Sequence, residues 1–420
     1  MAFEKLFQTI KIGTVEIKNR YAYAPTNLFL NWQGYVNEQE IAYYTARAMG
    51  GTGLIIVGAY LSTKIGVPYA NHPFIYVHDV THAPGLADVA ENIRLAGAVS
   101  FVQLLPFPSS GGRNWTGIQP AAPSPGIKPR WMGELRTQTE QLIEERMPNS
   151  WFYQNLGARA PSIKSREITV DEIQTIIKEH AFACKLAAYA GFEGIEHHMC
   201  HIYLVDEFRD PLINKRTDRY GGSEENRNRL LLELVEAGTR AAKEENPDIV
   251  VGVRVGSRGA DGGYTFEETK RLALQLQEMG MDYYHVTFGF GMPQEQQVDG
   301  RFLDYSKELK KILKIPVMTP AVHEPEMAEK AVAEGWTDMV SGAMRLIVDP
   351  EFVNKVKENR LKDIIKCPTP PCPVCSTSRL VPGIRRCVLN PEVGREQYNP
   401  KYQIWKGFSQ HPALRRKKGR

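Results

Sequence analysis

Short apolar runs alternate with longer amphipathic segments along most of this chain, and this alternation constrains its fold more than any other feature. We interpret eight of the runs as strands, because each has the length and the β-branched or aromatic content of a buried strand. In chain order these strands are predicted at 20–24, 53–57, 99–104, 194–197, 250–255, 283–287, 315–319 and 338–341. The segments between them have the apolar spacing of helices and are predicted at 38–49, 86–96, 170–190, 224–245, 266–278, 305–313, 325–334 and 350–358.

Eight strand–helix units in this order predict an α/β fold, a closed (β/α)8 TIM barrel that occupies residues 1–365. A doubly wound open sheet is the alternative, because a strand count alone does not decide closure. No Gly-x-Gly-x-x-Gly turn follows the first strand, and the alternation is regular, so both observations favour the barrel.

Residues 106–166 interrupt this alternation. The segment is rich in Pro, Gly and Ser, contains Trp115, Trp131 and Trp151, and is much longer than an ordinary strand-to-helix connection. We interpret it as a lid or binding element that faces the substrate. The alternative is a surface insertion that makes contacts in a homo-oligomer.

A second unit, residues 366–420, is predicted as a Cys-rich appendage. Cys367, Cys372, Cys375 and Cys387 follow the spacing C-x4-C-x2-C-x11-C. The first eight residues have no apolar leader, so we expect a cytoplasmic, reducing location in which clustered cysteines bind metal instead of forming disulfides. The spacing alone fits either zinc or a [4Fe–4S] cluster.

The bulk composition excludes several classes of protein. With 42% hydrophobic residues, 24% charged residues and a net charge of +4, the chain has the composition of a globular protein. There is no basic stripe interleaved with aromatic residues and no long apolar run, so neither nucleic acid nor a membrane is an expected partner.

Groups able to donate protons crowd together after the strand at 194–197. His198, His201 and Tyr203 fall at its carboxyl end or just beyond it, which is where parallel α/β proteins bind ligands. A His-x-x-His pair could instead bind metal, but the neighbouring sequence offers no evident third ligand such as a Glu motif. We interpret Cys184 as an ordinary core residue and Cys200 as a wall residue of the site.

Two motifs resemble those of a known family. The spacing His198-x-x-His201-x-Tyr203, followed by R-T-D-R-Y-G-G-S-E-E-N-R at 216–227, resembles the flavin-dependent old yellow enzyme family. Cys387-Val-Leu-Asn-Pro resembles the last-ligand motif of its iron–sulfur branch, the relatives of 2,4-dienoyl-CoA reductase and trimethylamine dehydrogenase. The resemblance implies a [4Fe–4S] cluster on the four clustered cysteines, although x4 replaces the usual x2 after Cys367.

The resemblance, which covers roughly 7–397, also implies FMN at the carboxyl ends of the barrel strands. The matching positions for the flavin ring are Pro25, Thr26, Asn27, Ala59, Gln103 and Arg254. Those for the phosphate are Ala321, Ala343, Met344 and Arg345. At this phosphate end the family's glycines are lost and its arginine is displaced by one position, so weaker FMN binding or another path for Arg345 is expected.

The implied chemistry is that of an ene-reductase acting on an α,β-unsaturated carbonyl, CoA-thioester or steroid-like substrate. His198 and His201 would hold the carbonyl oxygen, FMN would give hydride to the β-carbon, and Tyr203 would protonate the α-carbon. An amine dehydrogenase of the trimethylamine dehydrogenase type is one alternative. A non-enzymatic zinc-binding barrel subunit is another, because the phosphate glycines are eroded. His197 stands where the family usually has an apolar residue.

The source of electrons is a further expectation from the resemblance. Larger relatives continue into a domain for FAD and a pyridine nucleotide, announced by Gly-x-Gly-x-x-Gly, and this sequence contains no such motif. We therefore expect an electron-donor protein, namely ferredoxin, flavodoxin or an FAD/NAD(P)H-binding subunit. The basic residues at 415–420 would steer an acidic partner.

Overall fold

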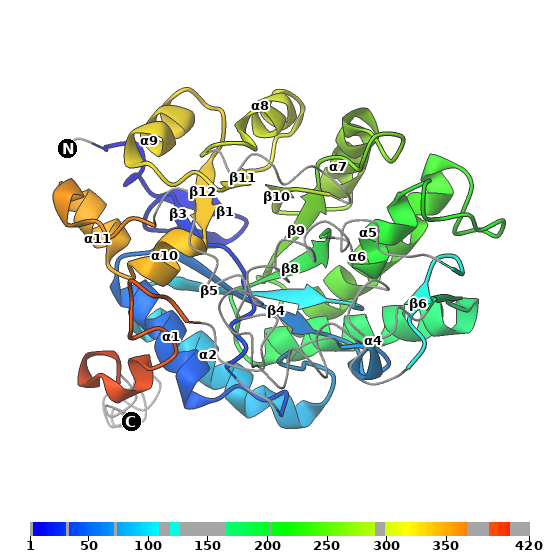
Figure 1. Ribbon diagram of the computed structural model, residues 1–420, viewed down its shortest axis with the longest axis horizontal. Helices are drawn as coiled ribbons and strands as arrows, with labels where there is room; N and C mark the ends of the chain where they lie inside the picture. Colours follow the sequence, from blue (N-terminus) through cyan, green and yellow to red (C-terminus); the bar gives the residue numbers. More distant parts are fainter. Residues whose placement is uncertain are drawn as a thin grey trace, which may run out of the picture.

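Eight parallel strands close into a barrel in the computed structural model, which describes residues 3–30, 33–70, 74–108, 118–126, 164–201, 203–289, 299–367 and 386–403 (Figure 1). The barrel strands are β3 (Tyr21–Tyr23), β4 (Leu54–Leu61), β5 (Val99–Leu105), β8 (Gly194–Met199), β9 (Val250–Gly256), β10 (Tyr283–Thr287), β11 (Val317–Pro320) and β12 (Met339–Gly342). The last strand pairs with the first, with Val340 opposite Tyr21. The predicted (β/α)8 TIM barrel is confirmed.

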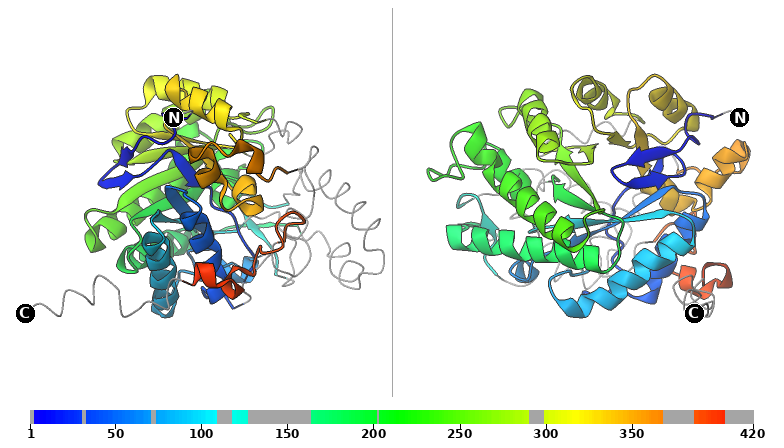
Figure 2. Two further views of the ribbon diagram at one scale, coloured as in Figure 1. Left: turned by 90° about the vertical axis from the view of Figure 1, so that its left-hand side faces the viewer. Right: turned by 180° about the vertical axis from the view of Figure 1, so that it is seen from behind.

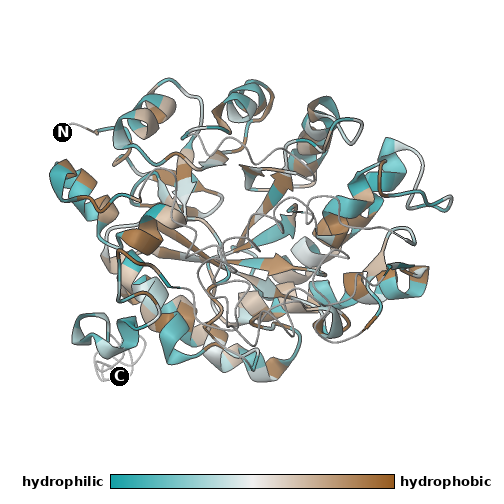
Figure 3. Cartoon of the chain, in the orientation of Figure 1, coloured by the Kyte–Doolittle hydropathy of each residue, from teal (hydrophilic) through white to brown (hydrophobic). Residues whose placement is uncertain are grey.

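Helices surround the barrel and turn their apolar sides toward it, so the brown strands in Figure 3 lie inside a ring of largely teal outer surfaces. The main helices are α1 (Glu38–Met49), α2 (Ala83–Leu95), α4 (Val170–Tyr189), α6 (Glu224–Glu245), α7 (Phe266–Glu278), α8 (Leu303–Ile312), α9 (Pro325–Ala333) and α11 (Phe352–Lys357). Each begins and ends within three residues of its predicted range. Among the described residues, none of the helices has the length and apolar character needed to span a bilayer.

Short elements that the sequence analysis did not predict complete the architecture. Helices α5 (Leu204–Arg209) and α10 (Met344–Val348) follow β8 and β12. Strands β1 (Ile10–Ile12) and β2 (Val15–Ile17) form an antiparallel hairpin. Its isoleucines pack against residues at the amino ends of barrel strands, including Leu54 and Val250. The hairpin covers that end of the barrel (Figure 2), which leaves the carboxyl end as the mouth for ligands.

The long segment predicted to leave the barrel is anchored at both of its ends. Strand β6 (Ala121–Ala122) pairs with β7 (Arg166–Glu167). The guanidinium of Arg216 donates hydrogen bonds to the carbonyls of Pro123 and Ile168, which lie beside these two strands. The run that begins at Arg216 thus fastens the segment to the barrel. Residues 109–117 and 127–163 lie outside the described part of the chain, and the lid or oligomer-contact role stays a prediction.

A C-terminal segment, residues 386–403, packs against α1. The Arg47 guanidinium forms an ion pair with Glu396 at 2.5 Å, and both side chains are fully buried. Arg47 also donates to the carbonyl of Leu346, and Asn390 donates to that of Ile347, so the segment is tied to α10 as well. Figure 1 places this segment, in red, beside α1. The division into units 1–365 and 366–420 stays a prediction.

We expect Glu396→Gln to loosen this segment, because it leaves the buried guanidinium of Arg47 without a counter-charge. Breaking one partner of a buried ion pair costs about 3–5 kcal/mol. Urea unfolding and the rate of proteolysis within 386–403 measure the loss. The control is Lys401→Met. Lys401 lies on the same segment and forms a more exposed ion pair with Glu351, so its loss should lower the free energy of unfolding by less than about 1 kcal/mol. Equal losses in the two variants would contradict this assignment.

Candidate active site

Strand β8 directs alternate side chains to opposite sides of the barrel wall. Glu196 and His198 face the lumen, where Glu196 meets Gln103 and Tyr283 from other barrel strands. His197 faces outward and contacts His180 of helix α4. This period of two follows from the pleat of a strand. The structure thus places His198 at the carboxyl-terminal mouth, as the sequence predicts.

A chain of hydrogen bonds joins the two predicted histidines to Arg254. Nε2 of His198 lies 3.2 Å from Nδ1 of His201, and Nε2 of His201 lies 2.8 Å from Oγ1 of Thr287. The Arg254 guanidinium lies 3.5 Å from the same hydroxyl. His201 has a φ of 62°, a left-handed conformation that costs roughly 1–2 kcal/mol for a residue with a side chain and turns its ring back toward His198. Thr287 is a site residue that the sequence analysis missed.

Neighbouring groups set the tautomers of these imidazoles. Arg254 donates to the Thr287 oxygen, whose second lone pair can accept from Nε2–H of His201, so Nδ1 of His201 carries a lone pair. Cys200 Sγ lies 3.7 Å from Nδ1 of His198, and burial raises the pKa of this thiol, so it remains an S–H donor. His198 then carries its proton on Nε2 and donates it to Nδ1 of His201. The thiol of Cys200 also lies close enough to both histidines to act with them as a third metal ligand. The sequence analysis did not recognise this ligand.

Tyr203 immediately precedes helix α5 and lies beside the histidine pair. Its ring centroid lies 5.0 Å from that of His198, and the two planes are nearly perpendicular. Tyr203 also packs against an apolar group that includes Ala59 of β4 and Leu105 of β5. The phenol is half-buried. The structure therefore brings together His198, His201 and Tyr203, the three predicted catalytic residues.

A polar network in the lumen supports this mouth from below. The carboxylate of Glu196 accepts hydrogen bonds from Gln103 at 2.6 Å, from Tyr283 at 3.0 Å and from His285 at 2.8 Å. His285 continues to the hydroxyl of Ser341 at 2.9 Å. Burial raises the pKa of Glu196, but His285, Arg254 and Tyr283 outweigh this effect and hold the pKa below its ordinary value. Glu196 is therefore ionised, and it fixes the amide of Gln103.

The residues predicted to bind FMN follow parallel barrel strands or lie in the carboxyl-terminal halves of these strands. Pro25, Thr26 and Asn27 come after β3, Ala59 is in β4, Gln103 is in β5, Arg254 is in β9, Ala321 follows β11, and Ala343, Met344 and Arg345 follow β12.

Two guanidinium groups at this mouth each have a buried Nε donor that is unsatisfied. Neither Nε of Arg254 nor Nε of Arg345 has a hydrogen-bond partner among the described residues. Arg345 is partly neutralised by an ion pair with Glu324 at 2.9 Å. Buried N–H groups without partners are uncommon in proteins, and guanidinium groups suit flavin and phosphate oxygens. The donor set therefore fits an anionic cofactor such as FMN.

The phosphate end keeps a glycine-like backbone even though the glycine is absent. Ala321 has a φ of 59°, in the left-handed region that glycine favours. His323, which the sequence analysis did not single out, lies 3.4 Å from the point where a Cβ on Gly342 would stand. The site therefore has the predicted substitution, but the backbone conformation at 321 does not depend on glycine.

The predicted cluster ligands are only partly within the described residues. Cys367 and Cys387 are half-buried, whereas Cys372 and Cys375 lie outside the described ranges. The metal assignment stays a prediction.

Comparison with known proteins places these features in context. Residues 5–363 match the NADH:flavin oxidoreductase / NADH oxidase family. The NADH oxidase of Thermoanaerobacter brockii is 35% identical over 413 residues, 94% of this chain and 57% of that protein. The cinnamate reductase of Clostridium sporogenes is 28% identical over 422 residues, 94% of this chain and 59% of that protein. The structure of 2-naphthoyl-CoA reductase with 2-naphthoyl-CoA has a TM-score of 0.78 and 28% identity, covering 96% of this chain and 59% of that one. This chain spans between half and two thirds of these proteins.

The neutral state of His198 predicts a marked loss of stability in acid. Burial and Arg254 lower its pKa to about 3, against about 6.5 in an unfolded chain. As pH falls, the unfolded chain therefore takes up a proton at His198 before the folded protein does, and this favours unfolding. The free energy of unfolding has its full value in this respect above pH ~7 and decreases between about pH 6.5 and 3. Between about pH 6.5 and 5 the loss is about 2 kcal/mol for this histidine.

Urea unfolding of the parent and of His198→Asn at pH 7.5 and 5 measures this loss. The variant should have the shallower pH dependence, and identical dependences would contradict the assignment. Between pH 6 and 8, His198 should contribute no pH dependence to the binding of a neutral carbonyl compound, because neither the free nor the bound protein takes up a proton at this residue.

Proposed function

As a member of the NADH:flavin oxidoreductase / NADH oxidase family, this chain is a flavin-dependent oxidoreductase, and we propose that it reduces the C=C bond of an α,β-unsaturated carbonyl substrate. The observation that carries the proposal is the pair of imidazoles, His198 and His201, whose facing nitrogens lie 3.2 Å apart beside the Tyr203 ring. Relatives named cinnamate reductase and 2-naphthoyl-CoA reductase support an unsaturated acid or acyl thioester as the substrate class.

FMN bound at the mouth would supply the hydride for this reduction. Pro25, Thr26, Asn27, Ala59 and Gln103 would hold the ring. The unsatisfied donor of Arg254 would stabilise negative charge on its polar edge. Ala321, Ala343, Met344 and Arg345 would hold the phosphate end.

The histidine pair would bind and polarise the substrate carbonyl. A carbonyl oxygen that enters between the rings would accept from Nε2–H of His198 in place of Nδ1 of His201. It would also accept from Nδ1–H of His201 once that ring has exchanged its Nε2 proton for one on Nδ1. The hydroxyl of Thr287 and the thiol of Cys200 would then donate to the opposite nitrogens, so both N–H groups would point into the site. Two preorganised donors at a position where negative charge develops are the main electrostatic contribution to such a reaction.

Tyr203 would complete the reduction as the proton donor. A phenol has an ordinary pKa near 10, so it holds its proton at neutral pH and releases it to a carbanion-like α-carbon. The edge-on contact with His198 and the packing against Ala59 fix the ring between the carbonyl site and strand β4. The hydroxyl would then regain its proton from solvent.

The four clustered cysteines would hold a [4Fe–4S] cluster that passes electrons to the flavin site. The packing of residues 386–403 against α1 and α10 supports this position, because Arg47 contacts both Glu396 and the α10 backbone. An electron-donor protein remains part of the proposal.

Tyr203→Phe tests the proton donor. We expect reduction of an enone or acyl-thioester substrate to fall by about 100-fold or more, the typical value of general acid catalysis, while reduction of the flavin by dithionite is unchanged. Stopped-flow measurement of flavin reduction and reoxidation separates the two half-reactions. The control is Tyr305→Phe, a half-buried tyrosine on the outer helix α8 that should leave both rates as they are. Parental turnover in Tyr203→Phe would remove this residue from the mechanism.

Cys387→Ala tests the cluster. Removing one thiolate should abolish most bound iron while FMN is retained, because the cysteine lies on the C-terminal segment and not in the lumen. Iron analysis and the visible spectrum after anaerobic purification measure the two cofactors. The matched control is Cys184→Ala, at a buried cysteine on helix α4, which should keep the iron of the parent. Iron that is equal in Cys387→Ala and the parent would exclude Cys387 as a ligand.

A further inference from the structure

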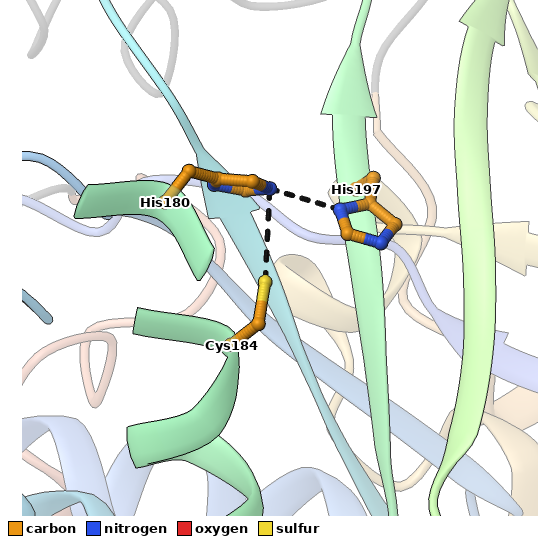
Figure 4. A group of neighbouring side chains, drawn as sticks. All are labelled: His180, Cys184 and His197. Carbon is orange, nitrogen blue, oxygen red and sulfur yellow. Dashed lines mark hydrogen bonds between the residues drawn. The ribbon is translucent and has the colours of Figure 1, made fainter. Parts of the chain in front are cut away.

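Three side chains able to bind metal meet on the outer side of the barrel wall (Figure 4). His180 and Cys184 lie one turn apart on α4, so they share a helix face. His197 points toward them from β8. Nε2 of His180 is 2.9 Å from Nδ1 of His197 and 3.7 Å from Sγ of Cys184. All three residues are fully buried, and neither the proposed reduction nor the [4Fe–4S] cluster uses them.

The far nitrogen of each imidazole has its own partner. Nδ1 of His180 lies 2.8 Å from the hydroxyl of Ser62, which itself donates to the carbonyl of Leu105. Ser62 is therefore an acceptor for His180 Nδ1–H, and Nε2 of His180 presents a lone pair. Nε2 of His197 lies 3.3 Å from the hydroxyl of Thr239. Outer partners of this kind orient histidines whose near nitrogens bind a metal.

Helix α6 leaves space for this group at Gly238. A Cβ at that position would stand 2.7 Å from Cε1 of His197 and 2.8 Å from Sγ of Cys184. Both distances are too short for any side chain, so glycine lets the thiol and the imidazole occupy the contact between α4, α6 and β8. The three ligand atoms lie within 4.8 Å of one another.

We propose that His180, Cys184 and His197 form a binding site for one thiophilic d10 metal ion, Zn²⁺ or Cu⁺, which fastens α4 to β8. Around such an ion, nitrogens stand about 3.3–3.6 Å apart and nitrogen and sulfur about 3.6–3.8 Å apart. The nitrogen–sulfur distance of 3.7 Å already agrees, and the nitrogen pair has to open by about half an ångström.

Binding exchanges a proton for the metal. Burial raises the pKa of Cys184, so the metal-free group holds a thiol. The S–H bond breaks, a bond from sulfur to metal forms, and the proton leaves to the buffer. His197 Nδ1 gives up its hydrogen bond to His180 and takes the tautomer that donates from Nε2 to Thr239. No change of oxidation state is involved.

The buried position favours Cu⁺ over Zn²⁺. One thiolate neutralises Cu⁺, whereas Zn²⁺ leaves a net positive charge in a site where every ligand is fully buried. Three ligands also suffice for copper in Cys-His₂ sites, whereas structural zinc sites use four. Thr239 Oγ1 is not a fourth ligand for zinc, because it lies at the outer nitrogen of His197. Either ion bound by these residues supports the site.

Metal titration of the full chain tests the proposal. In a background with Cys367, Cys372, Cys375 and Cys387 changed to Ser, we expect one Zn²⁺ or Cu⁺ per chain by elemental analysis, with anaerobic chelator competition to measure affinity. Cys184→Ala and His180→Gln should each weaken binding by about 100-fold or more. The matched control is Cys200→Ala, at the other fully buried cysteine beside two histidines, which should bind as the parent does.

A second measurement does not depend on the serine background. In the full chain with all its other cysteines, Cys184→Ala should hold one zinc or copper ion fewer than Cys200→Ala. X-ray absorption at the metal edge should find one sulfur and two nitrogen ligands at the site. Added metal at about 100 times its Kd should raise Tm by roughly 3 °C, and this rise should vanish in Cys184→Ala. The proposal is overturned if no ion binds, or if Cys184→Ala and His180→Gln bind as tightly as the parent.

Discussion

The ionised carboxylate of Glu196 at the centre of the barrel is the constraint on which the rest of the site depends. A buried carboxylate that loses its partners costs several kcal/mol, so the bonds from Gln103, Tyr283 and His285 have to form together. They join β5, β8 and β10, and His285 extends the network to Ser341 in β12. Because a slip of one residue would turn Glu196 out of the lumen, the network fixes the register of β8. His198, two residues later, must then face the mouth.

Strand β8 consequently serves two environments. Its lumen side carries Glu196 and His198, and its outer side carries His197 in the polar cluster with His180. The two sides differ in what they require: the inner side needs charge and donors for ligands, whereas the outer side needs tight packing against α4 and α6. A metal ion on the outer side would act on the active site only through the strand, by restraining the residue that precedes His198. That coupling is positional, since the two imidazoles belong to opposite faces of one pleated strand.

The sequence predicted the eight strands and the main helices because each has a local period that burial on one side imposes. It did not predict the β1–β2 hairpin, although Ile10 to Ile17 alternates apolar and polar residues around Gly13, because strands of three residues are too short to distinguish from a loop. Side-chain partners distant in sequence were also missed. Thr287 is 86 residues from His201, and Cys184 was interpreted as plain core because no local pattern relates it to His197. Such contacts follow from barrel closure and helix packing, which periodicity does not specify.

The phosphate end illustrates how the fold determines what a substitution means. From the sequence, alanine at 321 in place of a glycine suggested a weakened site. The backbone at Ala321 is nevertheless left-handed, because its amide donates to the carbonyl of Ser341 and its carbonyl accepts from the amide of Gly300 at 2.7 Å. These two bonds hold the conformation at a steric cost of roughly 1–2 kcal/mol, which a folded barrel of this size can absorb. The direction of the backbone is therefore set by the neighbouring segments, and glycine would only lower the strain. What the alanine adds at this position is one methyl group, so any weakening of phosphate binding has to come from the space that this methyl occupies and from the ion pair that holds Arg345 to Glu324.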